Sequence, residues 1–137
     1  MIRLTRRPTG LGEPLGRYSH LAVGSGDLVA IAGQVGKDAH GRLSGPSLAV
    51  QARQAYANLG VALAATGCGY ADVLKMTTYL VGAERVDEFM EARREIFSDL
   101  YPDSAYPPNT LLIVNRLVEP ELVFEVEALA IVPSNAE

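Results

Sequence analysis

The sequence predicts an α/β fold in which two helices pack on one face of a mixed β-sheet of five or six strands. Residues 48–66 and 84–100 place apolar side chains three or four positions apart, as amphipathic helices do. The segments around them are short and either apolar or alternating, which is typical of strands. Two helices can cover only one face of such a sheet, so the sequence predicts a two-layer sandwich in a single domain spanning residues 1–137.

The first two strands of the predicted sheet surround a glycine-rich turn. Residues 19–23 and 28–34 are largely apolar, and the sequence Gly-Ser-Gly-Asp at 24–27 is typical of a hairpin turn. The same glycines resemble a phosphate-binding loop, but such loops lead into a helix, whereas a strand follows here. We therefore expect a β-hairpin, and a short strand at residues 2–5 would complete the set of six.

The first helix, residues 48–66, follows a loop punctuated by glycine and proline. Ser47 stands at the N-cap position, and Gly67 comes directly after the apolar pattern, where helices commonly stop. Residues 73–81 return to alternation, which predicts a strand. Cys68 has no cation or base beside it in the sequence, so we expect a small structural residue rather than a reactive thiol.

The second helix, residues 84–100, carries acidic side chains in its first turns, where the helix dipole favours them. A proline-rich loop follows at residues 101–108. Residues 110–117 and 122–132 are apolar enough to form the last two strands, and Pro120 suits the second position of the turn between them.

Several of the predicted strands are apolar on both faces. The segments 28–32 and 111–114 contain no polar side chain, so neither has a side suited to water. The chain has no further elements to cover the second face of the sheet. We therefore expect a closed homo-oligomer in which other copies cover it, and pockets in such assemblies often lie between subunits.

Composition and charge exclude several classes of partner. The chain has 137 residues and a formal net charge of −4, so its field repels nucleic acid and anionic lipid. No segment approaches the roughly 20 apolar residues that cross a bilayer, so no membrane partner is expected. A single cysteine favours a reducing compartment, and we expect a soluble, cytoplasmic protein. The two histidines form no metal-binding motif, and neither a metal nor a cofactor is expected.

The last predicted strand carries a pair of carboxylates, Glu125 and Glu127, in an otherwise apolar sequence. Side chains alternate along a strand, so both carboxylates face the same side. In a partly apolar cleft the pKa of Glu125 would rise toward neutrality, which suits a general acid or base acting on water. A solvated glutamate on a wet face is the alternative. Glu127 is expected to be structural and to pair with a basic side chain, and Asn109 is a further polar residue at the entrance of the preceding strand.

Five short motifs occur in an order and at a spacing similar to those of a known family. They lie at residues 16–20, 32–34, 72–77, 107–109 and 125–128. Together they resemble the Rid family, whose members are also called YjgF-like or endoribonuclease L-PSP-like proteins and are named for reactive intermediate deaminases. The resemblance implies a chorismate-mutase-like α/β fold, a homotrimer, and small-molecule clefts between neighbouring subunits.

The resemblance also implies roles for residues by position. In deaminating members, a glutamate on the last strand activates the water that attacks an imine, and this position is Glu125. The tyrosine at the mouth of the cleft is Tyr18, and the backbone contact region is Ala32 and Gly33. The arginine that anchors a substrate carboxylate corresponds to Asn109 in this chain.

The absence of that arginine makes the chain a divergent member of the family that it resembles. Arginine binds a carboxylate through two charge-assisted hydrogen bonds, whereas asparagine offers one neutral amide, a difference of roughly 1–2 kcal/mol or more. Met90 also stands where deaminating members often carry asparagine. Arg116 is an odd number of residues from Asn109 and would face the other way. We hypothesise that Arg17, directly before Tyr18, supplies the missing positive charge.

Three functions remain open on these residues. The first is hydrolysis of an imine or enamine of a small metabolite, with Glu125 as base and Asn109 orienting a neutral substrate. The second is a non-catalytic metabolite-binding or chaperone-like trimer. The third is endoribonuclease activity, for which the acidic chain offers no stripe of basic and aromatic residues to contact RNA.

Overall fold

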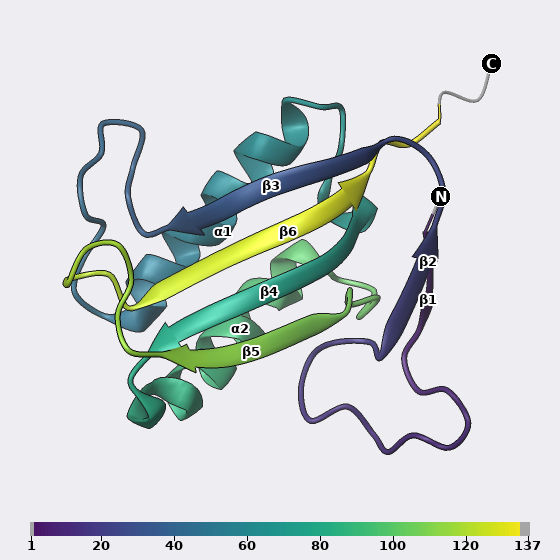
Figure 1. Ribbon diagram of the computed structural model, residues 1–137, viewed down its shortest axis with the longest axis horizontal. Helices are drawn as coiled ribbons and strands as arrows, with labels where there is room; N and C mark the ends of the chain where they lie inside the picture. Colours follow the sequence, from purple (N-terminus) through teal and green to yellow (C-terminus); the bar gives the residue numbers. More distant parts are fainter. Residues whose placement is uncertain (1, 135–137) are drawn as a thin grey trace.

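Six strands and two α-helices form the part of the chain that the computed structural model describes, residues 2–134 (Figure 1). In chain order they are β1 (Ile2–Thr5), β2 (Leu21–Gly24), β3 (Leu28–Val35), α1 (Leu48–Ala64), β4 (Val73–Val81), α2 (Val86–Leu100), β5 (Asn109–Val114) and β6 (Phe124–Ile131). Short 3₁₀ turns precede β4, at Tyr70–Asp72, and α2, at Ala83–Arg85. The predicted α/β two-layer fold is confirmed.

Four of the strands lie side by side in the order β3-β6-β4-β5 and form a mixed sheet. β4 and β5 run parallel, and the other two neighbouring pairs are antiparallel. β1 and β2 form a separate two-stranded antiparallel sheet. Figure 1 shows one face of the larger sheet toward the viewer, with both helices behind it.

The hairpin predicted around the glycine-rich segment 24–27 is wrong. β2 pairs with β1, whereas β3 pairs with β6. The segment instead carries the chain from one sheet to the other: Gly26 has a φ of +132°, and the carbonyl of Asp27 accepts a 2.9 Å hydrogen bond from the amide of Val132, just past β6. β6 gives β3 a partner of eight residues, whereas β2 has only four.

The first helix begins at the predicted residue and ends slightly early. Ser47 caps α1 as predicted, because its hydroxyl accepts a 3.3 Å hydrogen bond from the amide of Val50. The helix ends at Ala64, before the predicted end at residue 66. Gly67 follows with a φ of +79°, in the left-handed region that glycine adopts most readily.

A buried glutamine, Gln51, ties the start of α1 to the sheet. Its amide nitrogen donates hydrogen bonds to the carbonyls of Gly45 at 2.9 Å and Glu121 at 3.0 Å. Its side-chain oxygen accepts a 2.8 Å bond from the amide of Val123, directly before β6. One fully buried side chain therefore satisfies backbone groups of two separate loops.

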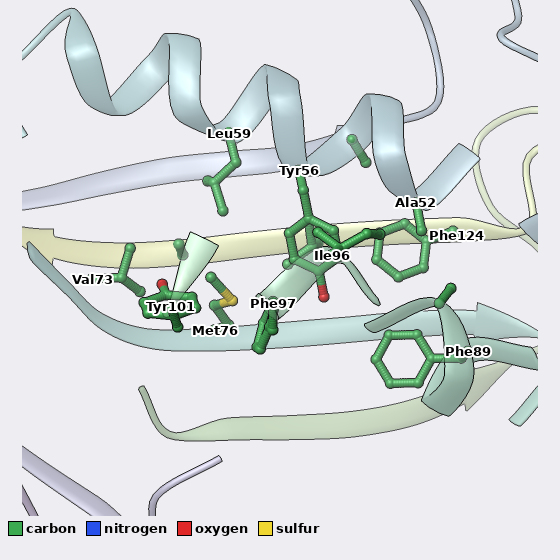
Figure 2. Packing of buried hydrophobic residues seen from close by; sticks show 14 of the residues in the cluster. Ala52, Tyr56, Leu59, Val73, Met76, Phe89, Ile96, Phe97, Tyr101 and Phe124 are labelled. Atoms are coloured by element: carbon green, nitrogen blue, oxygen red, sulfur yellow. The ribbon is translucent and has the colours of Figure 1, made fainter. Parts of the chain in front are cut away.

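The hydrophobic core lies between the two helices and the sheet and is rich in aromatic rings (Figure 2). Tyr56 of α1 meets Phe97 of α2 with ring centroids 5.4 Å apart, and it meets Phe124 of β6 at 5.5 Å. Phe89 of α2 stacks on Phe124 at 5.8 Å. Each such pair contributes about 0.5–1.5 kcal/mol beyond the burial of its surface. This packing fixes α2, and the side chains that it presents, relative to the sheet.

The face of the sheet opposite the helices, which we call the open face, is covered at one end, where Gly24 of β2 lies against Ile131, and the rest of it is not covered by any element within residues 2–134 (Figure 1). Apolar side chains on it are exposed: Leu28 is 61%, Leu112 41% and Leu129 37% accessible. Glu125 and Glu127 lie on the same face, since they alternate with the buried residues of β6. The open face is the surface for which the sequence predicts a partner.

Candidate functional site

The residues predicted to form the site divide into two groups at different places on the four-stranded sheet. Asn109 begins β5, which forms one edge, and Gly33 lies in β3, which forms the other. The groups also lie on opposite faces. Residues paired across neighbouring strands point to the same face, and side chains alternate between faces along a strand. Asn109 pairs with Met76 and Glu125 pairs with Tyr79, which is three residues further along β4, so Asn109 and Glu125 point to opposite sides of the sheet. One copy of the chain therefore does not bring Asn109 and Glu125 together.

Ala32 and Gly33 form a β-bulge in the edge strand. The ladder between β3 and β6 shifts register between Ile31 and Gln34, so the two residues lie opposite Glu127 alone. A bulge leaves its extra residue outside the regular pairing. The side-chain nitrogen of Gln34 donates a 3.0 Å hydrogen bond to the carbonyl of Ala32. Because of the bulge, the backbone groups of Ala32 and Gly33 fall outside the regular pairing with β6. These are the residues for which the resemblance implies a backbone contact with the ligand.

Glu125 lies directly against Gly33. A Cβ atom at Gly33 would overlap the Oε2 atom of Glu125 and would lie 2.9 Å from its Cγ atom. Only glycine leaves the carboxylate in this position, because any larger residue would displace it. We call Ala32, Gly33 and Glu125 the β3-edge group.

The surroundings of Glu125 favour its neutral form. Burial raises the pKa of Glu125 above its ordinary value, and the negative charge of Glu127 raises it further. A carboxyl group with a raised pKa is better matched to proton transfer near neutral pH than an ordinary surface glutamate. A raised pKa of Glu125 is also what the apolar sequence of the strand predicts.

Glu127 pairs with a phenol, so the predicted basic partner is wrong. The hydroxyl of Tyr79, on the neighbouring strand β4, donates a 2.6 Å hydrogen bond to Oε1 of Glu127. This bond is the main reason why the pKa of Tyr79 is raised. A phenol brings no positive charge, so the charge of Glu127 is not neutralised and continues to act on Glu125.

A pocket of about 370 Å³ opens beside Asn109. We call it the β5-edge pocket, and its lining includes side chains from α2, β5 and the loop before β2: Leu15, Tyr18, Met90, Arg93, Asn109 and Leu111. The hydroxyl of Thr78 donates a 2.7 Å hydrogen bond to Oδ1 of Asn109. Because Thr78 engages the oxygen, the amide nitrogen of Asn109 is the group that can donate to a ligand.

Arg93 brings a buried cation to this pocket. The residue lies on the buried face of α2 and is only 3% exposed. Its guanidinium lies over the ring of Phe89 at 4.7 Å and near that of Phe97 at 6.0 Å, and Nη2 lies 3.3 Å from the sulfur of Met90. No carboxylate within residues 2–134 forms an ion pair with it.

The sequence contains a signal for Arg93, although the prediction did not use it. Arg93 follows Phe89 by four residues and precedes Ile96 by three, so it shares the apolar face of the predicted helix. An arginine is almost never fully buried unless it is paired. Arg17 and Arg116 are the cations near Tyr18 and Asn109 in the sequence, whereas α2 brings Arg93 to the pocket beside Asn109 from a distant segment.

Tyr18 lies at the β5-edge pocket, where its hydroxyl accepts a 3.0 Å hydrogen bond from the amide of Leu15. Arg17 lines a neighbouring hollow of about 460 Å³, and its role as the missing cation stays a prediction. Arg116 lies beyond the end of β5 and donates to two backbone carbonyls of its own loop, at 3.0 and 3.1 Å. Of these two arginines, Arg17 is therefore the one near the pocket.

The cysteine and the first histidine make structural contacts. Cys68 is 7% exposed, and its sulfur lies 3.7 Å from the carbonyl of Ile131. Nε2 of His20 lies 2.7 Å from the carbonyl of Gly12. Across residues 2–134, no three histidine, cysteine or acidic side chains gather in a way that could hold a metal ion. None of the helices in this part of the chain is long and apolar enough to cross a membrane.

The fold and the two groups of residues define a YjgF-type α/β protein, a two-layer sandwich with a carboxylate on its last strand and a small, mostly apolar pocket beside Asn109 at the far edge of the sheet. Residues 10–132 match the model of the family described as Endoribonuclease L-PSP. The chain belongs to this family, which includes the Rid and YjgF-like proteins, so the predicted membership is confirmed.

Individual relatives are similar over most of the chain. A RutC family protein of Escherichia coli strain K12, YjgH, is 35% identical over 118 residues, which cover 85% of this chain and 84% of the relative. The 2-iminobutanoate/2-iminopropanoate deaminase of Homo sapiens is 32% identical over 119 residues, which cover 85% of this chain and 81% of the relative. The crystal structure of YyfB from Yersinia pestis, a Rid-family protein, has a TM-score of 0.83 at 30% identity and covers 95% of this chain and 98% of that one.

Proposed function

We propose that this protein hydrolyses the imine or enamine form of a small metabolite and releases ammonia. The observation that carries the proposal is Glu125, a partly buried carboxylate with a raised pKa that lies against a backbone bulge. The similarity to a human 2-iminobutanoate/2-iminopropanoate deaminase supports the reaction class. We place the reaction in the cytoplasm, where reducing conditions suit the one cysteine, Cys68.

A complete site would need two copies of the chain. The β3-edge group and the β5-edge pocket lie on opposite faces of one sheet and involve its opposite edges. A ring of copies that sets the β3 edge of one against the β5 edge of the next would join them. Three copies close such a ring in the homotrimer that the resemblance implies. The exposed apolar residues of the open face would then be covered by the other copies.

Glu125 is suited to move protons in both directions during the proposed reaction. Its carboxylate takes a proton from water as the water oxygen bonds to the carbon of a protonated imine, which gives a neutral carbinolamine. The protonated Glu125 then gives this proton to the nitrogen. The hydroxyl loses its proton to Glu125 as the C–N bond breaks, and the departing ammonia takes that proton away. Iminium and water thus give the carbonyl compound and ammonium, and Glu125 is restored.

Ammonia release from a 2-imino acid generated enzymatically in the assay tests the proposal. We expect the wild type to accelerate release, and Glu125→Gln to lower the rate by about 10²–10⁴-fold, the usual contribution of a general acid or base. Glu95→Gln is the matched control, since Glu95 lies on the surface of α2 and pairs with Arg53. Equal rates for the wild type and Glu125→Gln would show that Glu125 is not the base.

Mixing two inactive variants tests whether the site lies between copies. Glu125→Gln removes the base, and Asn109→Trp fills the β5-edge pocket with a large side chain. If the two groups come from neighbouring copies, random co-assembly of equal amounts restores about a quarter of the sites. If each copy supplies a whole site, the mixture stays as inactive as its components.

A metabolite-binding protein without turnover is the second candidate. The observation that favours it is Asn109, which stands where the resemblance places a substrate-anchoring arginine. In this case the wild type releases no ammonia, and Asn109→Arg gains the activity. Endoribonuclease activity, which the family description names, is disfavoured by the net charge of −4, and an RNA-cleavage assay of the purified protein would show it directly.

A further inference from the structure

We infer that Arg93 is an anion-binding residue which, together with the amide of Asn109, holds the carboxylate of a small acid in the β5-edge pocket. This inference rests on the proposed function for the reaction and adds the class of substrate to it. The sequence favours a neutral ligand because Asn109 stands at the expected arginine position. The fold brings a different guanidinium to the same pocket, from α2.

Arg93 is a buried cation without a counter-charge. It is 3% exposed, and within residues 2–134 no carboxylate pairs with it. The sulfur of Met90 and the ring faces of Phe89 and Phe97 accommodate the positive charge but leave most of its N–H donors without an oxygen acceptor. No nitrogen of the Arg93 side chain is both fully enclosed and unbonded, so the unbonded donors stay accessible, and Arg93 lines the β5-edge pocket.

The guanidinium of Arg93 is held between a loop and an aromatic ring. A Cβ atom at Gly16 would overlap Nη2 of Arg93 and would lie 3.4 Å from Cε of Met90, so the loop backbone packs directly on the guanidinium. The ring of Phe89 lies on it at 4.7 Å. A planar guanidinium fixed in this way presents its donors in one orientation, which suits the two oxygens of a carboxylate.

The surroundings strengthen the binding of an anion. Burial lowers the pKa of Arg93, and the nearby positive charge of Arg17 lowers it as well. An arginine stays protonated at neutral pH in spite of such shifts. An anion bound at Arg93 would offset both unfavourable effects, and the apolar side chains of Leu15 and Leu111 would keep water from weakening the interaction.

Direct binding of 2-oxobutanoate, a stable analogue of a 2-imino acid, tests the inference without turnover. Calorimetric titration compares it with 2-butanone, which lacks the carboxylate, and with inorganic phosphate. We expect Arg93→Met to weaken binding of 2-oxobutanoate by about tenfold or more, since a hydrogen bond to a charged group is lost. We expect Arg94→Met, at an exposed residue that pairs with Glu91, to leave the affinity unchanged.

Three results of the titrations would overturn the inference. The first is equal affinity of the wild type and folded Arg93→Met for 2-oxobutanoate. The second is a wild type that binds 2-oxobutanoate no more tightly than 2-butanone. The third is phosphate binding as tight as that of 2-oxobutanoate and equally dependent on Arg93, which would indicate a general anion site rather than a site for a small acid.

Thermal unfolding separates a ligand-binding role of Arg93 from a structural one. An unpaired buried cation lowers stability, so Arg93→Met should melt at the same temperature as the wild type or higher. Added 2-oxobutanoate should raise the Tm of the wild type but not that of the variant. If Arg93→Met melts lower and keeps the full ligand-induced shift, Arg93 is structural and the inference fails. Arg93→Lys, which keeps the charge but not the planar fork, should bind with intermediate affinity.

The inference and the proposed function fail in different ways. If the wild type binds 2-oxobutanoate through Arg93 and releases no ammonia from 2-imino acids, the inference stands and the hydrolysis fails. If Arg93→Met releases ammonia with unchanged KM, the hydrolysis stands and the inference fails.

Discussion

The two carboxylates of β6 have different roles in the proposed reaction. Glu125 lies against Gly33 at the bulge, and Glu127 is held by the hydroxyl of Tyr79 at 2.6 Å. Burial raises the pKa of Glu125 most, and the negative charge of Glu127 raises it further. The proton affinity of the acting carboxylate is therefore set in part by a neighbour that does not need to touch the substrate.

Removing the charge of Glu127 should shift the pH profile of ammonia release. In Glu127→Gln the pKa of Glu125 should fall, because only burial then favours the neutral form. Glu125 starts the reaction as an ionised base, so the rate falls as the pH drops below this pKa. The acid limb of the rate profile should therefore move to lower pH. Glu121→Gln, at an exposed residue, is the control, and a limb that stays in place or moves upward would contradict the role of Glu127.

At the scale of elements, Gln51 couples the first turn of α1 to the loop before it and to the entrance of β6. It reaches both because it is fully buried at their junction, with hydrogen bonds of 2.8–3.0 Å to three backbone groups. β6 lies between β3 and β4 and carries Glu125. The position of Glu125, the proposed base, thus depends on a strand whose start is fixed by this glutamine.

Replacement of Gln51 should destabilise the whole fold. Gln51→Leu has a similar size but leaves two carbonyls and one amide without partners, which should lower the free energy of unfolding by about 2–4 kcal/mol. Urea unfolding followed by circular dichroism measures the change. Gln54→Leu is the matched control. Among residues 2–134 the side-chain amide of Gln54 binds only Asn58 of the same helix, so we expect a change within about 0.5 kcal/mol. Equal stabilities of the two variants would show that Gln51 does not couple the elements.

The sequence was sufficient for the kinds of elements but not for their partners. Both helices and the last strands follow from periodicity, because one face of each is buried. The pairing of β3 with β6 depends on contacts between distant segments, which the glycine-rich turn at 24–27 does not reveal. Arg93 was missed for the same reason, since only the packing of α2 brings it beside Asn109. Glu125, in contrast, stands out locally as a carboxylate in an apolar strand.

At the scale of the whole molecule, one chain leaves most of one sheet face uncovered and keeps the two groups of residues of the proposed site apart. The open face exposes Leu28, Leu112 and Leu129, and the β3-edge group and the β5-edge pocket lie on opposite faces. A single arrangement of copies could cover the open face and also join the β3-edge group of one copy to the β5-edge pocket of another. Assembly and activity should therefore be lost together.

A charge on the open face should separate the copies. Leu112 is 41% exposed there, and Leu112→Asp should reduce the mass measured by light scattering toward the 14.6 kDa of one chain. Ammonia release should fall in parallel, because a lone copy holds only part of each site. Val118→Asp, at a 79% exposed residue in the loop after β5, is the control. A monomeric variant with full activity would contradict assembly of the site between copies.

The bulge at Ala32 and Gly33 also gives β3 one residue more than its pairing with β6 requires. Ile31 and Gln34, on either side of the bulge, both point to the helix side of the sheet. Deletion of Ala32 would leave one residue between them, as in a regular strand, so both side chains would keep their present face. A deletion inside a strand ordinarily disrupts the fold, but here the Tm should stay near that of the wild type while ammonia release is lost. The length of β3 at this point would then distinguish relatives that keep the reaction from those that keep only the fold.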